Sequence, residues 1–289
     1  MEFLQPETLA ESLDMKAAHP DARPIAGGTD FMVEMNFDRA RPDRIIDLSR
    51  LEELRGWSAR NETLRIGAGV TYTDLIHELS DGLPGLAMAS RMVGSPQIRN
   101  RGTVGGNLGT ASPAGDGLPP LYASDAIIEV ASVRGTRQMP VSDFITGPKR
   151  NALEPDELLC AFHVRKANGP QQYAKVGARN AMVIAVCSLG LALHPERGKV
   201  GACIGSAGPT PIRATDAESF IEGVISEGDL WQRRKDLPTS ATWRFGELVA
   251  AAAKPVDDVR GTAAYRRHAV GVLARRTLLW VWNEYRRER

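Results

Sequence analysis

The stretches PIAGGTDF (residues 24–31) and GTVGGNLGTASPAGD (residues 102–116) carry the strongest signal in the chain. Glycine reaches positive φ at little steric cost, so consecutive backbone N–H groups can turn inward and form a concave anion site. Thr29, Thr103 and Asn107 add side-chain donors, and Asp116 can accept hydrogen bonds from sugar hydroxyls. Together the two loops predict a pyrophosphate site built without Lys or Arg, although each loop alone is also typical of an ordinary turn.

Other phosphate, hydrolase and metal motifs are missing from the sequence. A Walker A motif needs GxxxxGK[ST], but Gly198-Lys199 continues with Val200, and a GxGxxG pattern that starts at Gly67 has Tyr72 in place of its last glycine. The five histidines show no HxxH or HExxH spacing, and there is no GxSxG elbow. The sequence therefore predicts no catalytic side chain and no metal site, and we expect any chemistry to be carried by a bound cofactor.

Length and composition exclude several classes of protein. The chain has 289 residues, which corresponds to two domains at roughly 150 residues each. With 36 Lys and Arg against 35 Asp and Glu, the net charge is +1, so nothing indicates nucleic acid or an anionic membrane as a partner. Cys160, Cys187 and Cys203 lack the spacing of an iron–sulfur or zinc site and are typical of a reducing compartment. Because neither a signal peptide nor a membrane-spanning run is evident, we expect a cytoplasmic protein.

The N-terminal part alternates between helix and strand patterns. Helical spacing occurs at residues 6–18 and again from Thr71, where Asp74 is placed for a capping box. Residues 82–117 show few periodic runs. The predicted strands are residues 24–26, 44–48, 64–68 and 126–133. The linker-like stretch KANGPQQ (residues 166–172) then places the main domain boundary near residue 168.

Beyond this boundary, strand patterns come first and helical patterns follow. The predicted strands are residues 183–193 and 200–206, and the predicted helices are residues 214–224, 245–253 and 261–285. The polar stretch Ser226–Thr242 between the first two helices is predicted to be a surface loop.

The last predicted helix belongs to a basic segment. Residues 254–289 contain nine Lys or Arg against four Asp or Glu. Such a surface is either a docking face for an acidic partner or simply a solvated helix face, and the solvated face is the commoner case. Trp280 and Trp282 are expected in the core or at a subunit contact, because large aromatic side chains dominate buried contacts.

Taken together, the two glycine loops resemble those of the FAD-binding subunit of molybdenum hydroxylases, the family of xanthine dehydrogenase and carbon monoxide dehydrogenase. The resemblance continues in KVGAR (residues 175–179), GSAGPTPIR (residues 205–213) and DVRGTAAYR (residues 258–266). It covers nearly the whole chain apart from residues 226–242. The GGTD of the first loop is closer to xanthine dehydrogenase-like members of the family.

The resemblance implies an α+β fold with two domains. The N-terminal FAD-binding domain (residues 1–168) would be of the vanillyl-alcohol oxidase type. It would have two lobes, about residues 1–57 and 58–168, with FAD extended in the cleft between them. The C-terminal domain (residues 169–289) would pack a small antiparallel sheet against three helices.

The resemblance also implies which residues bind FAD. The first loop would wrap the pyrophosphate with main-chain donors, the second loop would hold it from the other lobe, and later residues would contact the sugar chain and the flavin. A side chain added at Gly28 or Gly105 is expected to block the phosphates while the fold is retained. Val93 stands where animal xanthine enzymes carry an aromatic residue beside the flavin, so that stacking partner is missing. The implied FAD-binding residues are Ala26, Gly27, Gly28, Thr29, Asp30, Phe31, Thr103, Gly105, Gly106, Asn107, Thr110, Asp116, Leu153, Lys175 and Ile184.

In that family, the organic substrate is hydroxylated at a molybdenum cofactor on a large subunit. Electrons then cross two [2Fe–2S] clusters on a small subunit and reach the FAD of the third subunit, often within a dimer of heterotrimers. The resemblance implies that this chain passes electrons from reduced FAD to NAD⁺ or another acceptor. Its first loop favours a xanthine or purine dehydrogenase, with carbon monoxide, aldehyde and N-heterocycle dehydrogenases as alternatives.

Two hypotheses from other classes stay open on the sequence alone. A flavin-free assembly or nucleotide-binding module would keep the fold without the cofactor, and stoichiometric FAD in the purified chain would argue against it. A stand-alone flavin oxidoreductase related to vanillyl-alcohol oxidase would need a substrate pocket with a base and a longer chain. The three cysteines exclude the extra iron–sulfur insertion of some aromatic-CoA reductases.

Overall fold

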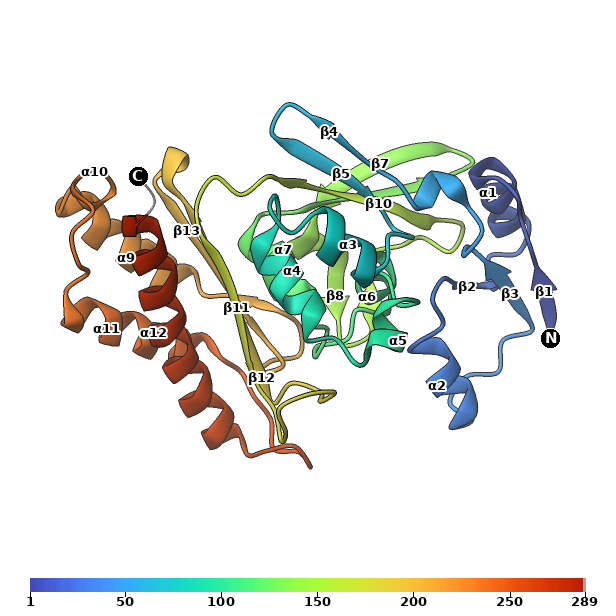
Figure 1. Ribbon diagram of the computed structural model, residues 1–289. Helices are drawn as coiled ribbons and strands as arrows, with labels where there is room; N and C mark the ends of the chain where they lie inside the picture. Colours follow the sequence, from blue (N-terminus) through green and yellow to red (C-terminus); the bar gives the residue numbers. More distant parts are fainter. Residues whose placement is uncertain (288–289) are drawn as a thin grey trace.

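The computed structural model describes residues 1–287 and confirms the predicted α+β class (Figure 1). Its first elements are β1 (Glu2–Leu4), α1 (Leu9–Ala18), β2 (Arg23–Ile25), α2 (Phe31–Asn36), β3 (Arg44–Asp47) and the 3₁₀ helix η1 (Glu52–Leu54). The three strands form a parallel sheet in the order β1-β3-β2, against which α1 packs. Helix α1 begins later than predicted because Thr8 caps it by accepting a hydrogen bond from the backbone N–H of Glu11.

A five-stranded antiparallel sheet forms the centre of the N-terminal part. Its strands are β4 (Trp57–Arg60), β5 (Thr63–Gly67), β6 (Ile127–Ser132), β7 (Gly135–Pro140) and β10 (Leu158–Arg165). Their order is β4-β5-β10-β6-β7, so β10 joins two hairpins that lie far apart in the sequence. Ile66, Ile128 and Phe162 are fully buried in the core that these strands share with the neighbouring helices.

Short helices fill most of the chain between β5 and β6. They are α3 (Tyr72–Glu78), α4 (Pro84–Arg91), α5 (Pro96–Arg99), α6 (Val104–Thr110) and α7 (Leu118–Ala123), and α8 (Val141–Phe144), β8 (Ile145–Gly147) and β9 (Arg150–Asn151) follow β7. The capping box at Thr71 and Asp74 is confirmed. Residues 82–117, which show few periodic runs in the sequence, contain three of these helices, α4, α5 and α6. Proline at the first helical position and the Ser95 and Thr103 caps start helices too short to show periodicity.

The C-terminal part is a four-stranded antiparallel sheet covered by helices on both faces (Figure 1). Its elements are β11 (Gln171–Val176), β12 (Cys187–His194), η2 (Pro195–Arg197), β13 (Lys199–Gly205), β14 (Ile212–Arg213), α9 (Thr215–Glu227), α10 (Leu230–Arg233), α11 (Thr239–Ala252) and α12 (Ala263–Arg287). Helices α9, α11 and α12 cover one face, as predicted, while α4 and α7 cover the other. Gly201 permits the close approach of α7, because a Cβ there would lie 2.0 Å from the carbonyl oxygen of Ala123.

Two sequence predictions in this part are wrong in detail. The strand predicted at residues 183–193 begins only at Cys187, because residues 177–186 form a loop beside the cavity described below. The stretch Ser226–Thr242 is not simply a surface loop, since it contains α10 and the start of α11. Leu230 and Leu237 anchor it by packing into the C-terminal core.

The three larger sheets use successive parts of the chain. The first uses strands from residues 2–47, the second from 57–165 and the third from 171–213. The domain division near residue 168 and the lobe division near residue 57 stay predictions.

Candidate functional site

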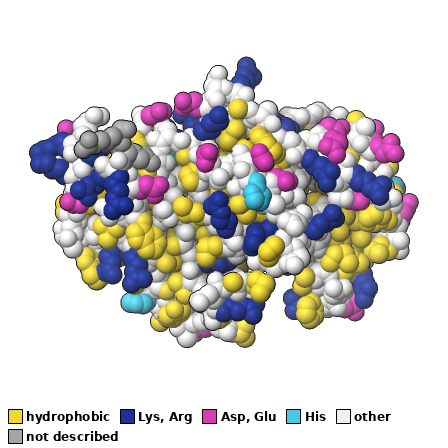
Figure 2. All heavy atoms as spheres, in the orientation of Figure 1, with side chains coloured by type: hydrophobic (Ala, Val, Ile, Leu, Met, Phe, Trp, Pro, Cys, Tyr) yellow, Lys and Arg dark blue, Asp and Glu magenta, His cyan; other side chains and the backbone are white. Residues whose placement is uncertain are grey.

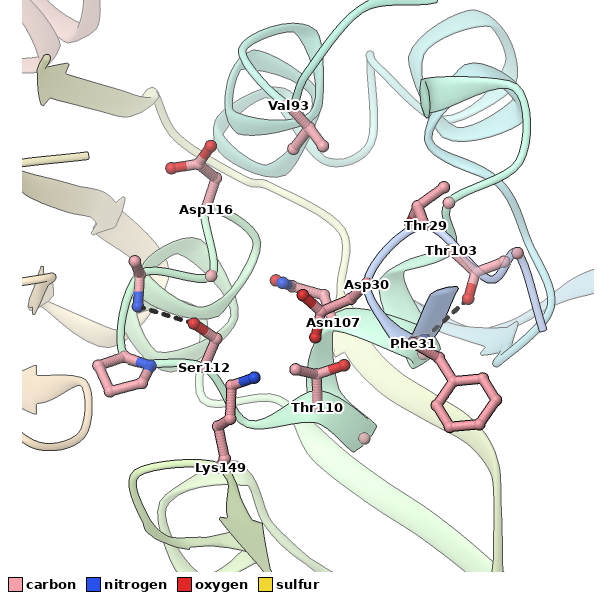
Figure 3. Close-up of a pocket in the computed structure, with 18 of the residues that line it drawn as sticks. Thr29, Asp30, Phe31, Val93, Thr103, Asn107, Thr110, Ser112, Asp116 and Lys149 are labelled. Carbon is pink, nitrogen blue, oxygen red and sulfur yellow. Dashed lines mark hydrogen bonds between the residues drawn. The ribbon is translucent and has the colours of Figure 1, made fainter. Parts of the chain in front are cut away.

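A large cavity runs from the first glycine loop to the C-terminal part (Figure 3). Its volume of about 1120 Å³ slightly exceeds the roughly 300–1,000 Å³ usual for small-ligand pockets. Of the fifteen residues implied to bind FAD, all except Lys175 line this cavity. The structure therefore brings together residues separated by up to 158 positions in the sequence, from Ala26 to Ile184.

The first loop follows β2 and forms one end of the cavity. Gly28 has a φ of +72°, which favours glycine, and its carbonyl accepts a hydrogen bond from the N–H of Met32 at 3.0 Å. Gly27 lies against the second loop region, where a Cβ would come 1.8 Å from the carbonyl oxygen of Arg101. Glycine at position 27 is thus what lets the two loop regions meet, and both loops contribute to one site.

The second loop continues directly into α6. Thr103 caps this helix, since its Oγ1 accepts a hydrogen bond from the N–H of Gly106 at 2.8 Å. Gly105 lines the cavity through its backbone, but a Cβ there would lie 2.3 Å from the carbonyl oxygen of Ala68, so its own missing side chain faces the protein; its contact with phosphate stays a prediction. Gly109 has the open position instead: it lines the cavity, and nothing lies within 4 Å of where its Cβ would be.

Polar side chains occupy the middle of the cavity wall. Figure 3 shows Asp30, Asn107 and Thr110 near one another between the two ends of the site. Part of the Asn107 amide is already used, because its Oδ1 accepts a hydrogen bond from the N–H of Gly117 at 3.1 Å. Asn107 therefore holds the following turn in place as well as facing the cavity.

Asp116 is held at the wall by two buried partners. Its Oδ1 accepts a hydrogen bond from the Tyr173 hydroxyl at 2.6 Å, and its Oδ2 lies 2.7 Å from Lys175 Nζ. Burial raises the pKa of the Asp116 carboxyl, and the neighbouring Lys175 ammonium opposes that rise. The Tyr173 and Lys175 side chains leave the same face of β11, as residues two apart in a strand do.

Lys175 is not among the residues that line the cavity, and its implied contact with FAD stays a prediction. Its side chain is only 4% exposed, and Nζ also donates to the carbonyl oxygens of Met92 at 2.9 Å and Val183 at 3.1 Å. All three ammonium protons are therefore engaged inside the protein. Lys175 fixes Asp116 and two segments next to Val93 and Ile184, which do line the cavity.

A cluster of charged residues beside the first loop was missed by the sequence analysis. Glu34 Oε1 lies 2.5 Å from Lys149 Nζ, and Oε2 lies 3.3 Å from Arg23 Nη2. The hydrogen bond from Lys149 is the main reason that the pKa of Glu34 is lowered. All three residues line the cavity, and Lys149 extends into it in Figure 3. The only sequence signal for Lys149 is its turn, Gly147-Pro-Lys-Arg150.

The C-terminal end of the cavity is formed partly by Ser206, Asp258 and Arg266. Arg266 is 4% exposed; its Nη1 donates to the carbonyl oxygen of Ser206 at 2.7 Å, and its Nη2 pairs with Asp258. The two ends of the DVRGTAAYR motif thus bind each other and tie the start of α12 to the segment after β13.

Within residues 1–287, no group of three or more His, Cys, Asp or Glu side chains is placed to hold a metal ion. Burial raises the pKa of Cys160 to about 11 and that of Cys187 to about 12, so these thiols are poor nucleophiles. Over the same residues, none of the helices is both long and apolar enough to cross a membrane.

Sequence comparison identifies the family. Residues 1–166, more than half of the chain, match the family model of the FAD-binding domain in molybdopterin dehydrogenase. The chain belongs to the FAD-binding subunits of molybdenum-containing dehydrogenases. Residues 172–281 match a second model, the C-terminal domain of carbon monoxide dehydrogenase flavoprotein. The predicted relationship to molybdenum hydroxylase FAD subunits is confirmed.

Individual relatives carry several different substrate names. The chain is 37% identical to the nicotinate dehydrogenase FAD subunit of Eubacterium barkeri, covering 77% of this chain and 79% of that one. It is 34% identical to the xanthine dehydrogenase FAD-binding subunit of Escherichia coli O157:H7, covering 82% and 86%. A structure of carbon monoxide dehydrogenase from Hydrogenophaga pseudoflava superposes with a TM-score of 0.89, at 27% identity and 98% coverage of both chains.

These matches decide between the classes left open by the sequence. The chain carries a FAD-binding domain and is an oxidoreductase subunit, which disfavours the flavin-free module. Several relatives are named medium chains or medium subunits, so these relatives are components of multi-subunit enzymes. The substrate names differ too widely for the family alone to give the substrate.

Proposed function

We propose that FAD lies extended in the cavity, with its pyrophosphate between residues 26–30 of the first loop and residues 103–107 of the second. The open space at Gly109 supports this proposal, because a cradle without a Cβ lets a bulky ligand reach the backbone. Thr110 would contact the flavin or the sugar hydroxyls. Val93, Leu153 and Ile184 would supply the apolar surroundings of the ring system.

FAD takes up electrons from one redox partner and gives them to another. The chain would bind and orient it: Asp116, held by Tyr173 and Lys175, would accept hydrogen bonds from sugar hydroxyls or the flavin edge while its own position stays fixed. Because the carboxylate is already positioned before FAD arrives, little additional ordering is needed on binding. No side chain of this chain needs to act as an acid or base on an organic substrate.

We further propose that the electrons come from two [2Fe–2S] clusters of a small subunit, after oxidation of the substrate at a molybdenum cofactor on a large subunit. The acceptor would be NAD⁺ or another oxidant, and the complex would be a cytoplasmic dimer of heterotrimers. Support comes from the family of the chain and, for a reducing compartment, from its three buried, unpaired cysteines. The family models end at residue 166 and resume at residue 172, which supports a domain division near residue 168.

For the substrate, we propose xanthine or another purine. The GGTD of the first loop and the 34% identity to a xanthine dehydrogenase subunit support this choice. Nicotinate, a different N-heterocycle, is the second candidate because the nicotinate dehydrogenase subunit is 37% identical. Turnover of each compound by the purified complex, with NAD⁺ as acceptor, distinguishes the two.

The FAD site itself is tested by the matched variants Gly109→Leu and Gly223→Leu. Both glycines lie in helices and have open space at the Cβ position, but only Gly109 lines the cavity. We expect Gly109→Leu to lose bound FAD, measured by flavin absorbance per chain, while its far-UV circular dichroism matches that of Gly223→Leu. Equal FAD content in the two variants would place the cofactor elsewhere.

A further inference from the structure

The outward face of α12 carries exposed aromatic and basic side chains. Tyr265 is 49% exposed and Trp280 is 48% exposed. Residues that are three or four positions apart share one side of a helix with 3.6 residues per turn. Side chains at such separations from Tyr265 to Trp280 therefore form a continuous stripe about 22 Å long. We call this stripe the α12 face; its members are Tyr265, His268, Val272, Arg276, Leu279 and Trp280.

The α12 face is not needed for packing within the chain. The opposite side of α12 contributes Val270, Ala274, Leu278, Val281 and Trp282 to the C-terminal core. Trp282 is buried in this core, whereas Trp280 is exposed and does not belong to it. Figure 2 shows hydrophobic and basic side chains intermixed over the half of the molecule that contains α11 and α12.

Helix α11 extends the surface beyond α12. Trp243 is 57% exposed, and the Arg275 guanidinium lies over its ring at 3.6 Å from the centroid. This stacking holds both side chains in place at the surface. The helices meet closely at Gly246 and Gly271, since a Cβ on Gly246 would lie 2.8 Å from the carbonyl oxygen of Gly271. Trp243 and the α12 face therefore form one rigid surface.

The charge on this surface determines the kind of partner. Helix α12 contains six arginines and a single acidic residue, Glu284. Two of these arginines belong to the surface described here: Arg276 is exposed on the α12 face, and Arg275 lies beside it over Trp243. Arg266 and Arg286 pair with Asp258 and Asp236 and do not contribute to it. In a two-fold contact between copies of this chain, the same basic patch with Arg275 and Arg276 would lie on both sides of the interface. Such like-charge pairing is unfavourable, whereas an acidic surface on a different protein is complementary.

We propose that the α12 face and Trp243 dock an acidic surface on another subunit of the dehydrogenase complex. Trp, Tyr and Arg are the residues most enriched where protein interfaces gain their binding energy. The inference rests on the proposed multi-subunit function, and it adds which surface of this chain the complex uses. This contact would lie on the side of the C-terminal sheet that faces away from α4 and α7.

Photo-cross-linking of the purified complex tests the location. Trp280 is replaced by p-benzoylphenylalanine in a tagged chain, and Trp57 on β4, which is 41% exposed, receives the same replacement as a control. We expect Trp280, but not Trp57, to cross-link to a segment rich in Asp and Glu on a different subunit, as mapped by mass spectrometry. No cross-link above the Trp57 control, or a cross-link to a second copy of this chain, would overturn the inference.

A charge-reversal variant tests the chemistry of the contact. We expect Arg276→Glu to weaken assembly of the complex at least tenfold at low salt and to reduce its salt dependence, whereas Arg60→Glu on β4 leaves both unchanged. Unaltered assembly of Arg276→Glu would contradict the proposed contact. If the unmodified chain purifies without any partner subunit, the proposed multi-subunit function fails instead, so the two failures are distinguishable.

Discussion

Replacing Lys175 by Met removes a buried cation and leaves its partners in place. The ammonium donates to Asp116, to Met92 and to Val183 at 2.7–3.1 Å, and its side chain is 4% exposed. Breaking a buried ion pair by removing one partner costs about 3–5 kcal/mol, because the other charge is left uncompensated. We therefore expect Lys175→Met to lower the free energy of unfolding by about that amount at pH 8.

The loss should depend on pH. Burial raises the pKa of Asp116 in the folded protein, and Lys175 opposes that rise. Without Lys175, the folded-state pKa moves further above the unfolded value, so the folded state binds a proton more readily than the unfolded state does. Stability from this group is then present at low pH and is lost as the pH rises through the folded-state pKa. The variant should consequently recover part of its stability at pH 5.

Urea unfolding at pH 5 and pH 8 measures both effects. The double variant Lys175→Met/Asp116→Asn should be more stable than Lys175→Met alone at pH 8, since it no longer buries an unpaired carboxylate. Lys199→Met, which removes an exposed lysine paired with Glu222, is the control and should change little at either pH. An equal loss at both pH values, with no recovery in the double variant, would refute the coupling of Lys175 to Asp116.

Three further substitutions test the packing around the site. Gly105→Ala should destabilise the chain by about 1–3 kcal/mol in urea unfolding, because its Cβ meets the backbone of Ala68; unchanged stability would mean that α6 shifts freely. Arg266→Met should lower the free energy of unfolding by about 1–3 kcal/mol, since a buried carbonyl loses its donor, and a loss no larger than that of the exposed Arg60→Met would contradict this role. Thr71→Ala should cost about 1 kcal/mol through loss of the capping box, which calorimetry can check against Thr63→Ala in β5.

Features decided by neighbouring residues were predictable from the sequence. The capping box needs only Thr71 and Asp74, and the strands around residues 64–68 and 126–133 follow local patterns. In contrast, Leu230 and Leu237 lie in a polar stretch, and their burial depends on a core supplied by distant helices. The loop prediction for Ser226–Thr242 failed for that reason.

In the candidate site, too, some features follow from neighbouring residues and others depend on tertiary packing. Both glycine loops were found from their composition, and the structure brings them together at Gly27 and Arg101. The direction that each missing Cβ faces depends on tertiary packing, so the sequence could not distinguish Gly105, which packs on the protein, from Gly109, which faces the cavity. Likewise, Lys175 belongs to the site region, but only the pairing of β11 with β12 turns it toward Asp116.

The position of β10 has a consequence for synthesis of the chain on the ribosome. The two hairpins β4–β5 and β6–β7 are complete once residue 140 has emerged, yet the strand that joins them spans Leu158–Arg165. Until that strand arrives, β5 and β6 each present an unpaired edge, a known route to aggregation. The cavity can therefore take shape only after more than half of the chain has been translated, and nascent chains stalled before residue 158 are expected to be the species that most need chaperones.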